Sequence, residues 1–176
     1  FGELMSDYSC LILELLSVFQ LIFIHLCSMK IKPTCAIAYS VDLLGDKWSL
    51  LILRDSILHK KTRFKQFRES KEKIATNILT NRLKFLVKEG FLELLDPEGT
   101  KKSKQYLATK RGLSTLPVII ELYLFSIHSI DESELNESQI NIKAEITANR
   151  IFFEKTKLKE YLEFLEELKS TVSFKK

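Results

Sequence analysis

The stretch that decides the fold spans residues 76–91 and reads TNILTNRLKFLVKEGF. Its leucines recur at the three- and four-residue spacing of an amphipathic helix, and Gly90 is a residue type that commonly ends one. A second set shares another face of that helix, at offsets of three, four, seven and eleven: Asn77, Thr80, Asn81, Lys84 and Lys88. This face carries amides, a hydroxyl and two cations but no acid. The stretch therefore predicts a helix with one packed side and one cationic, hydrogen-bonding side.

The polar face suits the major groove of DNA. Asparagine can pair with an adenine edge, lysine reaches guanine or phosphate, and threonine fits a base edge or a thymine methyl group. An ordinary solvated helix face is the alternative, and taken alone it is the commoner explanation of such a pattern. The flanking sequence decides between the two.

The flanks complete a winged helix-turn-helix pattern. Upstream, the basic segment 59–71 carries Phe64 and Phe67 three residues apart, which predicts a short helix. Downstream, the segments 91–95 and 100–107 surround an Asp-Pro-Glu-Gly turn, which predicts a β-hairpin. The return arm of this hairpin holds Lys101, Lys102 and Lys104. In a winged helix-turn-helix the second helix enters the major groove, and the hairpin lies along a neighbouring backbone.

The basic charge of the chain is concentrated in the same region. The whole chain has a net charge of only +4, but residues 29–112 hold 19 basic against 9 acidic side chains. Residues 1–28 and residues 113–176 each carry a net charge of −3. A surface that binds DNA phosphates requires basic side chains to be concentrated in this way.

No catalytic or ligand-binding constellation is visible in the sequence. The five glycines form no phosphate-binding loop, and the three histidines have no cysteine or acidic partner at metal-ligand spacing. We therefore expect a protein that is not an enzyme and that needs neither a metal nor a cofactor. The hydrophobic content of 45% is ample for one folded core.

The sequence closely resembles the HxlR family of bacterial winged helix-turn-helix transcriptional regulators. The resemblance runs from about residue 35 to residue 128. It rests on Cys35, Gly45-Asp46-Lys47-Trp48, Leu50-Leu51-Ile52-Leu53-Arg54, Arg63-Phe64, Leu79-Thr80-Asn81-Arg82-Leu83, Gly90-Phe91, Tyr106, Thr109 and Gly112. It implies a mainly α-helical fold with a small β-hairpin wing (α+β), extended here at both ends by helical segments.

The chain departs from the family pattern at three positions. Ala75 stands where a capping serine is usual, so Thr76 is an alternative cap for the recognition helix. Ala108 replaces a leucine, which predicts thinner packing under the wing, and Ala36 replaces the proline that usually follows the cysteine. Trp48 is expected in the core, with a ligand pocket as the alternative. Lys47 and Arg54 are expected at the surface.

The resemblance also implies a homodimer that binds an inverted repeat. The family builds its dimer interface from the helices before and after the winged helix, here residues 36–44 and 113–130. The second segment carries an apolar stripe of helical spacing, and we expect Pro117 to bend it. The alternative is that this stripe only covers the core of its own domain.

Cys35 is a candidate redox or electrophile sensor. It lies near a predicted helix N-terminus with Lys32 nearby, and both features favour a thiolate. Some family members use the equivalent cysteine in this way. The alternative is a small packing residue.

The two ends of the chain are harder to assign. Residues 1–28 form an apolar extension with polar interruptions, and Met29 resembles a family start, so we expect this extension not to belong to the native product. The alternatives are a helix that extends the dimer interface and a membrane anchor, which the polar interruptions disfavour. Residues 29–130 form the winged helix-turn-helix domain with its dimerisation helices. Residues 131–140 predict a linker, and the rest of 131–176 predicts an amphipathic helix that packs on its own domain or forms a short coiled coil.

These observations predict a cytoplasmic, homodimeric transcriptional regulator that binds double-stranded DNA, with an unknown small-molecule effector. The alternative is a winged-helix adaptor that binds protein rather than a specific DNA sequence. The expected DNA-contacting residues are Arg63, Lys65, Thr76, Asn77, Thr80, Asn81, Arg82, Lys84, Lys88, Lys101, Lys102 and Lys104.

Overall fold

The computed structural model describes residues 35–97 and 104–173, and side chains as far as residue 170. Its contacts divide the chain into two compact units, Phe1–Asp42 and Leu43–Lys176. In the first unit the described part comprises Cys35 and most of helix α2 (Ala36–Leu44). The side chains of residues 35–42 are exposed, among them Ile37 and Val41.

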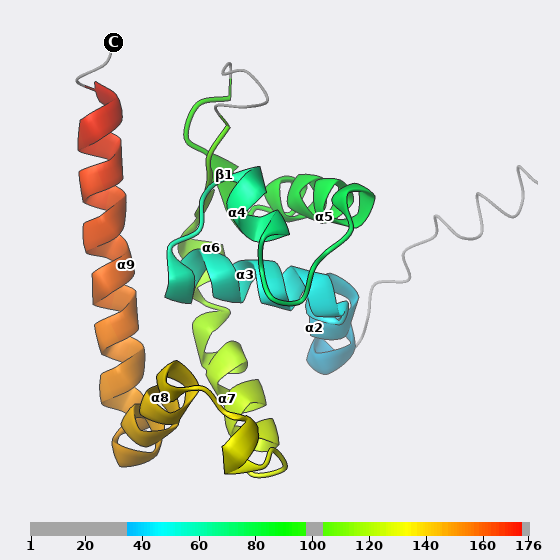
Figure 1. Cartoon of the computed structure of the whole chain (residues 1–176). Helices are drawn as coiled ribbons and strands as arrows, with labels where there is room; N and C mark the ends of the chain where they lie inside the picture. The colour runs from blue at the N-terminus through cyan, green and yellow to red at the C-terminus, as the bar shows by residue number, and fades with distance from the viewer. Residues whose placement is uncertain (1–34, 98–103, 174–176) are drawn as a thin grey trace, which may run out of the picture. The chain divides into compact units, whose positions relative to one another are not determined.

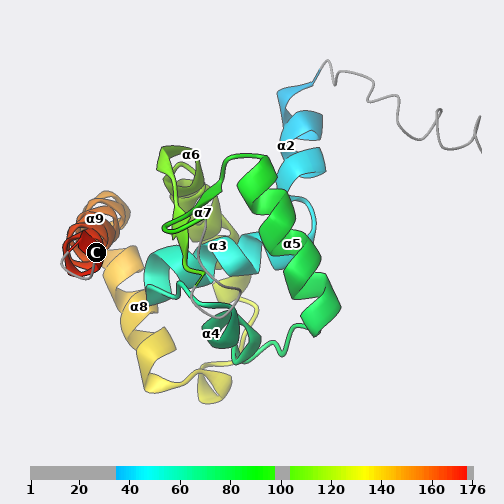
Figure 2. The same ribbon diagram turned by 90° about the horizontal axis from the view of Figure 1, so that it is seen from above.

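The second unit confirms the predicted fold class, helices with a small antiparallel hairpin. Figure 1 shows the two helices at its sides, α5 and α9, with α3 between them, and the view from above in Figure 2 agrees. The elements are α3 (Lys47–His59), α4 (Phe64–Arg68), α5 (Thr76–Lys88), β1 (Leu92–Leu94), β2 (Tyr106–Ala108), α6 (Lys110–Leu113), α7 (Leu116–Ile127), the 3-10 helix η1 (Glu132–Glu134), α8 (Glu137–Ala148) and α9 (Arg150–Ser173).

Helix α3 is the central support of this unit. Its first turn is capped by Asp46, whose Oδ1 accepts from the backbone N–H of Trp48 at 3.1 Å and of Ser49 at 3.0 Å. This cap satisfies two of the amide groups that a helix start leaves unpaired. The helix then buries Ile52, Leu53 and Ile57 in the core.

Helix α5 has the bounds that the sequence predicts. It begins at Thr76 with Ala75 in the capping position and no side-chain cap, so the alternative in which Thr76 caps the helix is wrong. Its end is a Schellman motif, in which Gly90 N bonds Val87 O at 3.1 Å and Phe91 N bonds Leu86 O at 2.8 Å. Gly90 has a φ of 72°, which a residue with a Cβ rarely adopts.

The wing pairs β1 with β2 in the register Leu92↔Ala108, Glu93↔Leu107 and Leu94↔Tyr106. The second half of the predicted turn, Glu98 and Gly99, lies outside the described residues, as do Lys101 and Lys102. Beneath the wing, Ala108 is buried, with only 2% of its surface exposed. A Cβ added to Gly112 would lie 3.2 Å from the Ala108 Cβ and 2.2 Å from the Phe91 carbonyl oxygen, so α6 passes very close to the strands.

Pro117 does not bend a long helix as expected. The chain instead forms two helices, and Pro117 lies in the first turn of α7. That position suits proline, because its missing N–H would have no partner there in any case.

The C-terminal part differs from the predicted linker and terminal helix. Residues 131–140 contain η1 and the start of α8, so the linker prediction is wrong for most of this stretch. Asn136 and Gln139 start α8 through a reciprocal capping box, in which the side chain of each accepts from the backbone of the other. Helix α9 packs on its own domain, with Phe153 and Tyr161 in the core, which is one of the two alternatives for the terminal helix.

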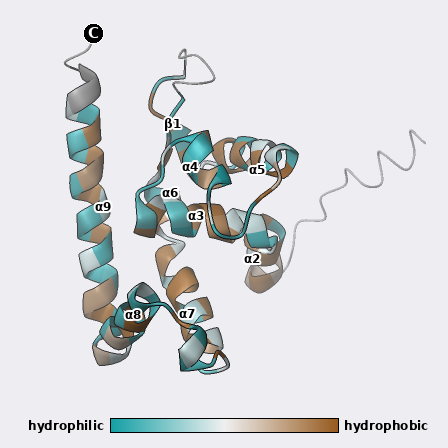
Figure 3. Ribbon diagram, viewed as in Figure 1, coloured by the Kyte–Doolittle hydropathy of each residue, from teal (hydrophilic) through white to brown (hydrophobic). Residues whose placement is uncertain are grey.

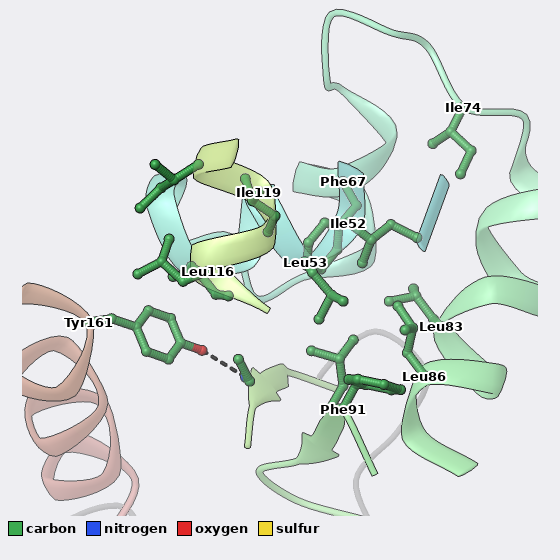
Figure 4. Packing of buried hydrophobic residues seen from close by; sticks show 14 of the residues in the cluster. Ile52, Leu53, Phe67, Ile74, Leu83, Leu86, Phe91, Leu116, Ile119 and Tyr161 are labelled. Atoms are coloured by element: carbon green, nitrogen blue, oxygen red, sulfur yellow. Dashed lines mark hydrogen bonds between the residues drawn. The ribbon is translucent and has the colours of Figure 1, made fainter. Parts of the chain in front are cut away.

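One hydrophobic core joins α3, α4, α5, the wing, α7 and α9. Figure 4 shows Leu53, Phe67, Leu86 and Phe91 converging from four segments. Trp48 is half-buried and packs against this core. Among the residues that the structure describes, no helix combines the length and the apolar character needed to cross a membrane.

Candidate nucleic-acid interface

The predicted DNA-contacting face of α5 is exposed. Asn77, Asn81, Lys84 and Lys88 are exposed and Thr80 is half-exposed. On the opposite side Leu79, Leu83 and Leu86 are buried, each with at most 1% of its surface exposed. Because packing fixes the leucine side, the rotation of the helix about its axis is fixed too, and the polar face points to solvent.

Most of this face is available to a partner. Among the described residues, the side chains of Asn77, Asn81, Lys84 and Lys88 have no hydrogen bond or ion pair with one another or with the rest of the domain. The Thr80 hydroxyl donates to the Thr76 carbonyl oxygen at 2.8 Å. In this arrangement Thr80 offers a base its oxygen lone pairs, so it can accept from adenine or cytosine amino groups.

Arg82 lies apart from the other predicted residues of α5. Its Nη1 is 3.2 Å from Asp46 Oδ2, at the capped start of α3, and its guanidinium lies 5.6 Å from the centroid of the Phe85 ring. Arg82 therefore joins α5 to α3 within the domain. The prediction placed it among the DNA contacts because sequence spacing does not show this partner.

Two further predicted residues, Arg63 and Lys65, are exposed at the start of α4. Gln66 Oε1 accepts from the backbone N–H of Thr62 at 2.9 Å and of Arg63 at 2.8 Å, which fixes the chain where α4 begins. Lys65 lies 3.8 Å from Glu69 one turn later, a weak exposed pair that leaves the ammonium group accessible.

The wing supplies Lys104, which is half-buried at the start of the return arm. The segment just before α4 holds the base of that arm. Tyr106 N donates to Thr62 O at 2.8 Å, and Arg63 forms a β-bridge with Gln105. The structure thus links the segment before α4 to the wing, and Lys104 directly precedes Gln105, the residue that bridges Arg63.

A buried carboxylate behind this surface was not predicted. Asp55, with 2% of its surface exposed, accepts from Lys61 Nζ at 2.7 Å and from Arg54 Nη2 at 2.6 Å. Ser70 also donates to it, and Arg54 reaches Glu72 at 2.8 Å. The contacts of this Asp55 cluster join α3 to the chain on both sides of α4.

The charge state of Asp55 follows from its surroundings. Burial by itself raises the pKa of a carboxyl group, but the hydrogen bonds from Lys61, Ser70 and Arg54 outweigh it and hold the pKa of Asp55 below its ordinary value. Arg54, expected at the surface, keeps 27% of its side chain exposed, and both ends of its guanidinium are paired within the domain. The available sequence signal was an Arg-Asp pair directly after an apolar helical run.

Two other predicted residues can be placed. The hollow beside Trp48 has a volume of about 10 Å³, which accommodates about one water molecule and is far too small for an organic ligand. Cys35 is exposed, and the backbone N–H groups of Ala38 and Ile37 lower the pKa of its thiol. Lys32, the other feature expected to favour a thiolate, lies outside the described residues.

The arrangement of an exposed α5, a short α4 and a paired wing defines a winged helix-turn-helix protein. The chain belongs to the HxlR-like helix-turn-helix family, whose pattern matches residues 43–134. This confirms the resemblance seen in the sequence. The match ends before α8 and α9, which lie beyond the matched residues.

Individual relatives agree with this assignment. The chain is 28% identical over 97 residues to the uncharacterised HTH-type transcriptional regulator YdzF of Bacillus subtilis, covering 55% of this chain and 86% of that protein. It is 32% identical over 89 residues to the uncharacterised HTH-type regulator sll1512 of Synechocystis, covering 51% of this chain and 65% of that protein. The solved structure of PA1607, a candidate transcription factor, is 28% identical with a TM-score of 0.52, covering 60% of this chain and 72% of that one.

Proposed function

We propose that this chain is a cytoplasmic transcriptional regulator that binds an inverted-repeat operator as a homodimer, with α5 in the major groove and the wing on the adjacent backbone. The supporting observation is the exposed, acid-free face formed by Asn77, Thr80, Asn81, Lys84 and Lys88. A protein-binding adaptor has no need of an exposed helix face without acids, so this face favours DNA over the adaptor alternative.

The apolar stripe that the sequence assigned to the dimer interface packs on the core of its own domain, which was the alternative; it comprises Leu113, Leu116, Ile119, Ile120, Tyr123, Leu124 and Ile127. Dimerisation is supported instead by a second apolar stripe on another face of α7, which is exposed. Val118, Leu122 and Phe125 lie at spacings of four and three, with 46%, 46% and 84% of their surfaces exposed. Figure 3 shows that α7 is hydrophobic along most of its length. A second copy would cover this stripe, and a two-fold protein would present two copies of α5 about one DNA turn apart, roughly 34–36 Å.

The test of DNA binding starts with duplexes selected by the wild-type chain from a library of random sequence. Asn81→Ala and Lys84→Ala should each reduce the preference for the selected duplex over a scrambled one, by about 1–3 kcal/mol for a base contact that is lost. Lys104→Ala should weaken both duplexes alike, because a phosphate contact carries no sequence information. Lys159→Ala on α9 is the matched control, since it removes an exposed lysine far from α5. Unchanged preference in both α5 variants would contradict the proposal.

The test of dimerisation is Phe125→Glu in the full chain. A charge on this stripe, which a second copy would bury, should convert the dimer to a monomer in light scattering. Phe152→Glu is the control, because Phe152 is an exposed aromatic of α9, 67% exposed, outside the stripe. A Phe125→Glu chain that stayed dimeric would place the interface elsewhere.

The proposal includes Cys35 as a sensor of oxidants or electrophiles. The thiol is exposed, and the neighbouring backbone N–H groups stabilise the thiolate, which is the reactive form. Modification at the head of α2 would add bulk beside a helix that the family uses for dimerisation. A two-fold DNA-binding protein tolerates little change in the spacing of its recognition helices, so such a change would lower operator affinity.

A further inference from the structure

On the edge of β2 that faces away from β1, the backbone N–H groups donate to two different kinds of acceptor. In an antiparallel strand, alternate N–H groups point to opposite edges, so those of Tyr106 and Ala108 both point away from β1. Tyr106 N donates to Thr62 O at 2.8 Å, as in a short third strand. Ala108 N donates instead to Tyr161 Oη at 2.7 Å. The phenol of Tyr161 on α9 is thus the acceptor for the N–H group of β2 that the backbone of residues 62–63 does not reach.

Tyr161 is held rigidly in this position. None of its surface is exposed, and its ring packs against Phe164 with the ring centroids 5.9 Å apart. Its hydroxyl also lies 3.4 Å from Ser56 Oγ of α3. Because Ala108 N can only donate, the phenol oxygen accepts from it, and in the contact with Ser56 either hydroxyl can be the donor. One hydroxyl group therefore joins α3, α9 and β2, and Figure 4 shows it pointing from α9 toward the strand.

The hydrogen bond from Ala108 to Tyr161 connects the wing to a helix that lies beyond the residues matched by the family. The family match ends at residue 134, whereas α9 begins at Arg150. Lys169 of α9 also lies 3.7 Å from Glu93 of β1, but both side chains are half exposed, which makes this contact weak. The buried phenol is therefore the contact through which α9 can fix the base of the wing.

We propose that Tyr161 is a positioning residue for the wing, so that the C-terminal helix takes part in DNA binding without touching DNA. The strands of the wing are only three residues long, and a short hairpin pivots about its base. Lys104 lies four residues before Ala108 on an arm that is held at two places, by residues 62–63 and by Tyr161. Without the phenol the arm keeps only the attachment at residues 62–63 and can turn about it, which moves Lys104 relative to a phosphate. This inference rests on the proposed DNA-binding function.

The test compares the salt dependence of DNA binding in full-length chains, with the duplex selected by the wild type as the probe. Tyr161→Phe keeps the ring and removes only the hydroxyl. It should reduce the slope of log affinity against log salt by about one unit, the loss of about one phosphate contact. In the wild type, Lys104→Gln should reduce the slope by a similar amount. In the Tyr161→Phe background Lys104→Gln should have almost no further effect, because two residues that act through one contact are not additive.

Phe153→Leu serves as the matched control. Phe153 is a buried core residue of α9, 3% exposed, that has no bond to the wing. It should lower thermal stability without changing the salt slope. The inference is overturned if Tyr161→Phe keeps the wild-type slope with a full Lys104 effect, or if Phe153→Leu changes the slope as much. A wild-type chain that binds no duplex would overturn the proposed function itself, and this inference with it.

Discussion

Replacing Asp55 by asparagine should lower the stability of this protein markedly. The substitution keeps the size of the side chain but removes the charge that faces Lys61 and Arg54 at 2.7 and 2.6 Å. Removing one partner of a buried ion pair costs about 3–5 kcal/mol. Lys61 and Arg54 keep 22% and 27% of their side-chain surfaces exposed and can regain some hydration, so we expect a loss near the lower limit, about 3 kcal/mol. For a chain of this size that lowers Tm by about 6–12 °C.

The measurement is urea and thermal unfolding of the full chain followed by circular dichroism at neutral pH. Glu69→Gln is the control, because it removes an exposed carboxylate 3.8 Å from Lys65 and should cost less than about 0.5 kcal/mol. A loss below about 1 kcal/mol for Asp55→Asn, or an equal loss in the control, would refute the structural role given to the Asp55 cluster.

The same cluster predicts a pH dependence. The pKa of Asp55 is lower in the folded chain than in the unfolded chain, so its ionisation stabilises the fold above the unfolded value, near 3.9. This contribution is lost as the pH falls from there through the lower pKa of the folded state. The stability difference between wild type and Asp55→Asn should therefore be constant near neutral pH and shrink below about pH 4. A difference that grew on acidification would contradict the sign of this pKa shift.

Three further predictions concern single residues. Gly112→Ala should destabilise the fold by about 1–3 kcal/mol in urea unfolding, since its Cβ would lie 2.2 Å from the Phe91 carbonyl oxygen and must push the wing away. Asp46→Ala should cost about 1–2 kcal/mol by loss of the α3 cap, and Asp46→Ser should restore most of this, because serine also caps. Cys35→Ser should keep DNA binding but abolish its loss on treatment with diamide and glutathione, which together form a mixed disulfide at an exposed thiol, measured with Cys10 and Cys27 replaced by serine in every chain. An unchanged diamide response would leave Cys35 without a sensing role.

The helix-turn-helix could be predicted because its signals are local. Helix α5 begins and ends where the leucine spacing and Gly90 place it, and its polar face is exposed as the spacing of Asn77 and Lys84 predicts. Local sequence patterns predicted the wrong element at two places. Thr115 and Pro117 start a new helix where the apolar stripe suggested one bent helix, and the capping box at Asn136 makes a helix from a segment that looks like a polar linker.

The sequence by itself determined the class of this protein, since helical periodicity, turn residues and the distribution of charge each depend on neighbours along the chain. Only the tertiary structure decided which polar groups are used inside the domain. Asp55 collects partners from residues 54, 61 and 70, and Arg82 turns to Asp46 rather than to solvent. Tyr161 meets Ala108, 53 residues earlier, and no periodic pattern joins them. Such pairings follow from the packing of whole elements, because a buried polar group must find whichever partner the fold brings within reach.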